Sequence, residues 1–274
     1  MIDKINTCFS ALPNEIVLNV FSFLNLDTLG RICSVSTKWK QLASDEKLWK
    51  KREVYENAIT NKKWAQWFGE EVVAGEDFNE EWESLPWNIS WILQSRCPIF
   101  PGKKIKETHR LVRLPKTLNG GLTLKTLGEL AKKYFPNNPK GYIDIWPSII
   151  DELGDKSIEK SCWVMIPEDV LPKSRCKSYA EQQKMVNELA EKSLISYEVP
   201  ETLESAACIL SQYFDSNIRL FSDNPWTYTR CKDKVKDFQI NVGGLASAVA
   251  SDGLSVFLSH YNDDNIGVAV LRKF

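Results

Sequence analysis

Histidine is scarce in this chain of 274 residues, where only His109 and His260 occur. A cysteine hydrolase needs a thiolate, a histidine base and usually an orienting acid or amide. The arrangements that remain open combine His260 and Asp263 with one of three cysteines: Cys162, Cys176 or Cys231. Free cysteines are more often small buried hydrophobes, and His260 falls in a segment with the pattern of a strand. We therefore expect no catalytic residues and no enzyme.

Cysteine pairs are also missing. The seven cysteines include no CxxC pair, their number is odd and their spacing is irregular. This pattern argues against a disulfide framework and against zinc fingers, and it fits reduced thiols in the cytoplasm. Phosphate-binding glycine loops of the GxxxxGK[ST] or GxGxxG kind are absent as well. Acidic pairs such as Asp151-Glu152, Glu168-Asp169 and Asp263-Asp264 could hold a cation, but solvated loop and helix ends explain them better. We expect no cofactor and no metal.

The sequence has no excess of either charge, because its 35 Lys and Arg residues nearly balance its 36 Asp and Glu residues. A net charge of −1 gives no electrostatic reason to expect nucleic acid or an anionic membrane as a partner. No apolar run reaches the roughly 18–20 residues of a membrane span. Neither the 20–29-residue period of leucine-rich repeats nor the 40–50-residue period of propeller blades is visible.

The first helix expected near the N-terminus carries more apolar surface than its size requires. The segment Glu15–Leu24 follows Pro13 and is expected to be a short helix, the first of four in residues 12–52. Its apolar side chains cover an arc of about 160°, or about 220° with Leu18, whereas one buried face needs a stripe of little more than 100°. A domain of about 45 residues is also small for folding alone. The excess apolar surface therefore predicts a protein partner.

The run from Leu12 to Arg52 resembles an F-box: it has the opening Leu-Pro-x-Glu, the Val-Phe-Ser-Phe-Leu core and the closing Leu-Trp in order. This resemblance implies that the segment 12–49 binds a Skp-family adaptor protein and, through it, cullin and RING subunits of a ubiquitin ligase. The residues to which it assigns adaptor binding are Leu12, Pro13, Ile16, Val17, Val20, Phe21, Leu24, Leu29, Cys33, Val35, Trp39, Leu48 and Trp49.

We expect an α+β protein in three parts. Residues 1–58 form the all-α F-box, residues 59–100 a Trp-rich helical linker, and residues 101–274 an α+β substrate-recognition domain. The helices expected in this last part are 122–134, 178–193 and 201–213. The segments FQINV, GLSVFLSHY and GVAVLRKF alternate or are β-branched between glycine-containing turns, so they predict a C-terminal antiparallel sheet.

Stretches of the C-terminal part, among them LFSDNPWTYTRC and the ending NIGVAVLRKF, resemble a family of F-box proteins from chlamydia-like bacteria that live in amoebae. That resemblance implies a secreted effector acting in the host cytoplasm. It carries no biochemical role for the C-terminal part.

The segment 223–230 combines turn residues with aromatic and arginine side chains, which are enriched in binding hot spots. We expect Trp226, Tyr228 and Arg230 to contact a client protein; the alternative is a buried loop. The function predicted is thus an adaptor that recruits a client. The alternatives are a decoy that occupies the Skp-family adaptor without a substrate, and an enzyme targeted by its F-box.

Overall fold

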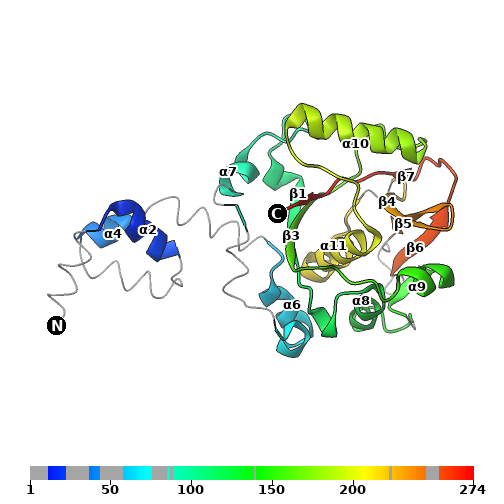
Figure 1. Cartoon of the computed structure of the whole chain (residues 1–274), viewed down its shortest axis with the longest axis horizontal. Helices are drawn as coiled ribbons and strands as arrows, with labels where there is room; N and C mark the ends of the chain where they lie inside the picture. Colours follow the sequence, from blue (N-terminus) through cyan, green and yellow to red (C-terminus); the bar gives the residue numbers. More distant parts are fainter. Residues whose placement is uncertain are drawn as a thin grey trace. The chain divides into compact units, whose positions relative to one another are not determined.

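The computed structural model describes residues 12–22, 37–43, 58–75, 85–86, 89–138, 140–221, 224–244 and 253–274. The protein forms two compact units, Met1–Asn57 and Ala58–Phe274 (Figure 1). Each unit is considered by itself below.

The described part of the first unit consists of two short helices, α2 (Asn14–Ser22) and α4 (Thr37–Ala43). They match the first and third of the four helices expected in this region. The residues expected to form the second and fourth helices lie outside the described residues.

The second unit begins with α6 (Asn61–Phe68), which the side chain of Thr60 caps by accepting a hydrogen bond from the Lys63 amide. Trp64 is fully buried, and its indole N–H donates to the Arg113 carbonyl at 3.0 Å. The structure therefore places α6 in the core of the second unit, whereas residues 59–100 were expected to be a separate linker. The remaining helical segments before the first strand are η1 (Glu70–Val73), α7 (Ile89–Gln94) and η3 (Ile105–Glu107).

Two sheets follow. The smaller has the order β1-β3-β8 and is antiparallel; its strands are β1 (His109–Leu114), β3 (Cys162–Pro167) and β8 (Arg272–Lys273). The larger has the order β2-β6-β5-β4-β7, with strands β2 (Tyr142–Ile145), β4 (Tyr228–Val235), β5 (Phe238–Gly243), β6 (Leu254–Ser259) and β7 (Ile266–Gly267).

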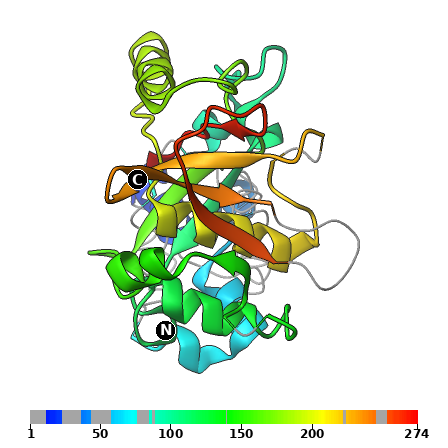
Figure 2. The ribbon, with the colours of Figure 1, turned by 90° about the vertical axis from the view of Figure 1, so that its right-hand side faces the viewer.

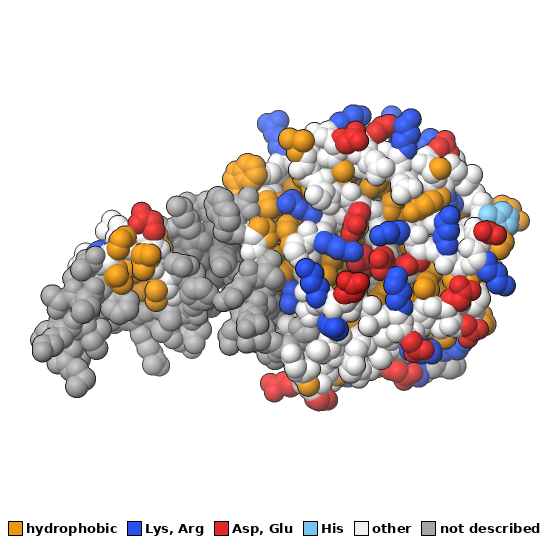
Figure 3. All heavy atoms as spheres, viewed as in Figure 1, with side chains coloured by type: hydrophobic (Ala, Val, Ile, Leu, Met, Phe, Trp, Pro, Cys, Tyr) orange, Lys and Arg blue, Asp and Glu red, His pale blue; other side chains and the backbone are white. Residues whose placement is uncertain are grey.

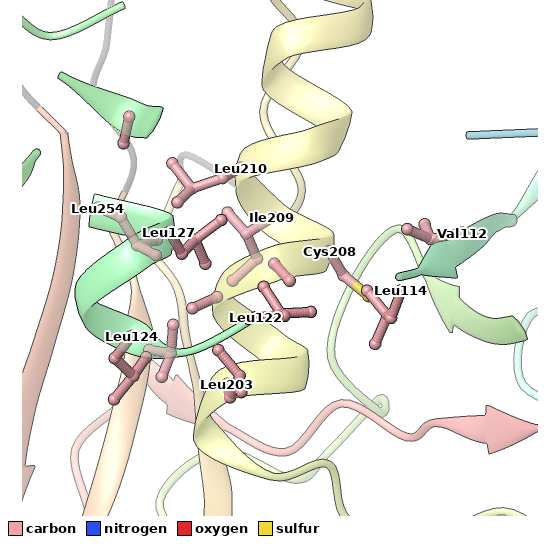
Figure 4. Packing of buried hydrophobic residues seen from close by; sticks show 14 of the residues in the cluster. Val112, Leu114, Leu122, Leu124, Leu127, Leu203, Cys208, Ile209, Leu210 and Leu254 are labelled. Atoms are coloured by element: carbon pink, nitrogen blue, oxygen red, sulfur yellow. The ribbon is translucent and has the colours of Figure 1, made fainter. Parts of the chain in front are cut away.

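Helix α11 (Thr202–Ser216) is the centre of the second unit. Twelve of its fifteen residues are buried, because it contacts β1 on one side and β4 and β5 on the other. In Figure 4, Cys208 points toward Val112 and Leu114 of the β1 region, while Ile209 and Leu210 lie toward Leu127 and Leu254. A helix with apolar residues on all sides is typical of such a central position.

The other helices surround this centre: η4 (Leu118–Gly120), α8 (Leu124–Ala131), α9 (Pro147–Leu153) and α10 (Tyr179–Ser193). Ser178 begins α10 with a capping box, since its hydroxyl accepts from the Glu181 amide and the Glu181 carboxylate accepts from the Ser178 amide. The predicted helices 122–134, 178–193 and 201–213 correspond to α8, α10 and α11.

The α+β class is confirmed, and the antiparallel sheet is confirmed for β4, β5 and β6. The outer pairs β2–β6 and β4–β7 are instead parallel. The C-terminal segment GVAVLRKF is also divided between the two sheets. Its middle is fully buried, and there the side-chain hydroxyls of Ser174 and Thr229 accept from the amides of Val268 and Ala269. In this middle part, side-chain hydroxyls accept the hydrogen bonds that a neighbouring strand would accept in a continuous sheet.

Candidate docking surface

Helix α2 begins directly after Pro13, whose carbonyl accepts hydrogen bonds from the amides of Ile16 and Val17 at 3.1 and 3.2 Å. Proline suits this end of a helix because the first amides have no partner within the helix. Glu15 adds an acid in the first turn, where the helix dipole favours negative charge.

One face of α2 packs against α4. Val17 and Phe21, four residues apart, are buried together with Leu42. The rings of Phe21 and Trp39 meet edge to face, with their centroids 5.8 Å apart. Leu12 and Leu18 lie partly buried against the same cluster. This face accounts for about half of the apolar arc of the helix.

The adjacent face of α2 remains uncovered. Ile16 and Val20, also four residues apart, are 49% and 39% exposed, and Pro13 beside them is exposed too. Figure 3 shows hydrophobic side chains gathered on the visible face of the described part of the first unit. We call Pro13, Ile16 and Val20 the outer face of α2. It is the surplus apolar surface that the sequence predicts.

Seven of the predicted adaptor-binding residues are described. Pro13, Ile16 and Val20 are exposed, Leu12 and Trp39 are half-buried, and Val17 and Phe21 are buried. In this conformation the buried pair holds α2 on α4, and the outer face of α2 remains exposed to solvent. The other predicted residues, Leu24, Leu29, Cys33, Val35, Leu48 and Trp49, lie outside the described residues.

The predicted client-binding residues of the second unit differ in their accessibility. Trp226 and Tyr228 are half-buried; the Arg219 guanidinium lies 4.0 Å from the Trp226 ring, and the Tyr228 ring meets that of Phe257 at 4.9 Å. Arg230, in contrast, is buried, and it donates to the carbonyls of Lys177 and Tyr261. The turn-rich sequence predicts a surface position for Arg230, but loops distant in sequence cover it.

Three thiols among the described residues are shielded from ionisation by burial. Cys162, Cys208 and Cys231 are buried, and burial raises the pKa of each thiol, whereas a reactive cysteine needs a lowered pKa. His109 is also buried, which lowers its pKa to about 4, with the Ile105 carbonyl opposing the shift. Cys176 is exposed, and its amide bonds the Asp263 carbonyl.

The described part of the protein offers neither a cluster of metal ligands nor a membrane-spanning helix. No group of three or more His, Cys, Asp or Glu side chains could hold a metal ion among these residues. None of the helices in the same segments is both long and apolar enough to cross a membrane.

Residues 9–54 match the F-box-like family. The sequence is 49% identical to F-box/LRR-repeat protein 5 of Mus musculus across 45 residues, and 47% identical to that of Bos taurus across 45. The protein of Xenopus tropicalis is 51% identical across 39 residues. These matches cover 14–16% of this protein and 6% of the relatives. No solved structure matches it.

The family match contains both described helices of the first unit, and therefore both the packed pair Val17 and Phe21 and the exposed pair Ile16 and Val20. Residues 9–54 of this protein thus match an F-box-like domain.

Proposed function

We propose that this protein is a substrate-recruiting adaptor subunit of a Skp–cullin–F-box ubiquitin ligase. The F-box-like domain binds a Skp-family adaptor protein through the outer face of α2, and the second unit holds a client protein. The observation that carries the proposal is the exposed apolar pair Ile16 and Val20 inside the region of the family match.

The proposed contribution of this protein to ubiquitin transfer is proximity. A client held near the charged conjugating enzyme experiences a high effective concentration of the thioester, without any acid or base from the adaptor subunit. The chemistry of the described residues agrees with a non-catalytic role, since the buried thiols Cys162, Cys208 and Cys231 have raised pKa values. We therefore propose that the protein is not an enzyme.

We further propose that this ligase works in the cytoplasm, and in the host cytoplasm if the protein is a secreted effector. The support is the resemblance of the C-terminal part to F-box proteins of chlamydia-like bacteria. A reporter fusion expressed in such a bacterium tests this: the reporter should appear in the amoeba cytoplasm during infection, and retention inside the bacterium would contradict secretion.

The adaptor contact is tested with the double variant Ile16→Gln, Val20→Gln. Glutamine keeps the helix propensity of α2 while it removes the apolar surface. Truncating central anchors of an interface commonly costs about 2 kcal/mol each, so affinity for a purified Skp-family adaptor should fall by more than about tenfold. The matched control is Leu194→Gln, since Leu194 is 92% exposed on the second unit. Unchanged affinity of a folded double variant would refute the proposed contact.

Client recruitment needs a separate measurement. Affinity purification from cells with the proteasome inhibited should enrich a ubiquitylated client together with the adaptor. Recovery of the adaptor alone would favour the decoy, which shares the docking surface but presents no substrate. The Ile16→Gln, Val20→Gln variant should lose the adaptor and keep the client, because the two are proposed to bind different units.

A further inference from the structure

Three aromatic side chains are exposed together at one end of the five-stranded sheet. Phe238 begins β5, and His260 and Tyr261 directly follow β6, the strand that pairs with β5. Phe238 is 37% exposed, Tyr261 is 63% exposed, and His260 is exposed as well. In Figure 3, a histidine, hydrophobic side chains and an acidic side chain lie together at the right-hand edge of the second unit. We call Phe238, His260 and Tyr261 the aromatic cluster.

The rings of the aromatic cluster contact one another outside the core. The centroid of the His260 ring lies 5.4 Å from that of Phe238 and 4.2 Å from that of Tyr261. Since side chains alternate along a strand, Phe238 points to the same side of the sheet as Ile240 and Val242, which pack in the core with α11. Figure 2 shows α11 behind strands β4, β5 and β6. A contiguous exposed group of this kind, unlike a single exposed apolar residue, is typical of an interaction site.

Three carboxylates adjoin the aromatic cluster. Asp237 directly precedes Phe238, and Asp263 and Asp264 follow Tyr261 at the second and third positions. All three aspartates are exposed, and within the part of the chain that the structure describes none of them forms an ion pair. Their charge is therefore available to a partner of opposite sign.

The cations of the adjoining segments, in contrast, mostly have contacts. Lys177 forms an ion pair with Glu181 at 4.0 Å, and the ammonium of Lys234 lies 6.0 Å from the centroid of a tyrosine ring. Arg230 is buried and donates to two backbone carbonyls. Lys236, in the turn between β4 and β5, is the cation left without an ion pair among the described residues of these segments. The exposed charges that remain are mainly negative, which favours a cationic ligand and disfavours an anionic one.

We propose that the aromatic cluster binds an arginine side chain of the client protein. The guanidinium lies on the exposed ring of Tyr261, and the carboxylates of Asp263 and Asp264 accept hydrogen bonds from its N–H groups. Aromatic rings attract cations over their faces, and the planar guanidinium of arginine stacks on a ring where the ammonium of lysine cannot. This assignment rests on the proposed receptor role of the second unit.

The histidines give a direct readout, because His260 belongs to the aromatic cluster whereas His109 is buried. Nuclear magnetic resonance of the full-length protein with labelled histidine is recorded while a probe peptide is added at millimolar concentration, since a single exposed contact of this kind is weak. The three probes are N-acetyl-Gly-Arg-Gly-amide and the same peptide with citrulline or lysine in place of arginine. Citrulline keeps the shape of arginine without its charge.

The arginine peptide should shift the ring signals of His260 and leave those of His109 in place. The citrulline and lysine peptides should bind at least about threefold more weakly, because one lacks the charge and the other lacks the planar group. The proposal is wrong if the arginine peptide moves no signal of His260, or if either of the other two peptides binds as tightly.

Variants of the site provide a second measurement. Tyr261→Ala should lower the affinity for the arginine peptide by about threefold or more, whereas Tyr261→Phe keeps the ring and should retain it. Asp263→Asn with Asp264→Asn should also lower this affinity, because it removes both carboxylates. The control is Glu191→Gln at an exposed residue of α10, about 18 Å along the helix from Tyr179, and its affinity should be unchanged. Full affinity in Tyr261→Ala and in the asparagine variant would overturn the assignment.

The outcome is separate from that of the proposed function. The peptide titration requires neither the Skp-family adaptor nor a client, so it can fail while affinity purification still enriches a ubiquitylated client. Adaptor binding is measured on α2, and failure there leaves the titration of the aromatic cluster unaffected.

Discussion

The two units differ in the groups that they leave without a contact. The first unit leaves apolar side chains exposed, whereas the second leaves polar groups buried without a hydrogen bond. In the described part of the first unit, three buried side chains form the cluster of Val17, Phe21 and Leu42, and the neighbouring face of the same helix is left apolar and exposed. The second unit buries α11 between two sheets and pairs many of its surface charges, as Lys156 does with Glu201 and Asp233. Its unsatisfied groups are polar and buried, such as Asn241.

This difference indicates what each unit needs from a partner. Covering Ile16 and Val20 removes apolar area from water, which is non-directional and stabilises the first unit as it binds. A buried polar group such as Asn241 instead needs a partner of matching geometry, which supplies specificity more than area. The proposed contact of the first unit is therefore non-directional, whereas any contact to the polar groups of the second unit is directional.

The largest expected effect concerns the core of the second unit. Trp64→Ala should destabilise it by about 3–5 kcal/mol, because a fully buried indole and its hydrogen bond to Arg113 are both lost. Chemical denaturation of the full-length protein measures this. Trp91→Ala is the control, since Trp91 is 71% exposed, and its cost should be small. Equal costs would mean that α6 does not belong to the core.

A second expected effect depends on pH. The pKa of His109 is about 4 in the fold and about 6.5 when unfolded, so the unfolded protein takes up a proton first. Stability is fully present above pH 6.5 and is lost as pH falls toward 4, by about 3 kcal/mol in total for this group. His109→Gln should remove this component of the pH dependence, whereas His260→Gln, at an exposed residue, should retain it. An unchanged pH profile in His109→Gln would contradict the burial of this imidazole.

Periodicity and capping predict helices α8, α10 and α11, because their signals are local, whereas α9 is not predicted. Ser178 followed by Glu181 marks the start of α10, and the apolar run of residues 201–213 marks α11. Strands β1 and β3 escape detection because both are buried on nearly every residue, so the alternation of a half-exposed strand is missing. The sequence also does not predict that Trp64 and Phe68 pack in the core, since their partner Phe214 lies far along the sequence.

The sequence predicts the candidate sites only as far as local patterns determine them, and contacts between distant segments decide the rest. The apolar arc of α2 predicts that a surface is left over, but only the position of α4 decides that Val17 and Phe21 are buried and Ile16 and Val20 are not. For Arg230, local turn residues suggest exposure. Its burial depends on the carbonyls of Lys177 and Tyr261, which no local pattern brings to β4.

A smaller effect is expected at Asn241 of β5. Asn241→Leu replaces the unpaired buried amide with an apolar side chain of similar size, and should stabilise the second unit by about 1 kcal/mol. Thermal melting without any probe measures this. Asn241 would then be a group retained at a cost to stability. A destabilised variant would instead show that the amide has partners in solution that support the fold.

The smallest effect on stability is expected at the outer face of α2. Ile16→Gln with Val20→Gln should change the stability of the free protein by no more than about 0.5 kcal/mol, because both side chains are already in water and glutamine is a good helix former. Phe21→Ala, one residue further along the same helix, should cost about 3–5 kcal/mol, since it empties the contact with Trp39. Chemical denaturation of the full-length protein, with and without the Skp-family adaptor, compares the two. If the glutamine variant unfolds as readily as Phe21→Ala without the adaptor, the outer face of α2 belongs to the fold of the protein itself and is not a surface kept for a partner.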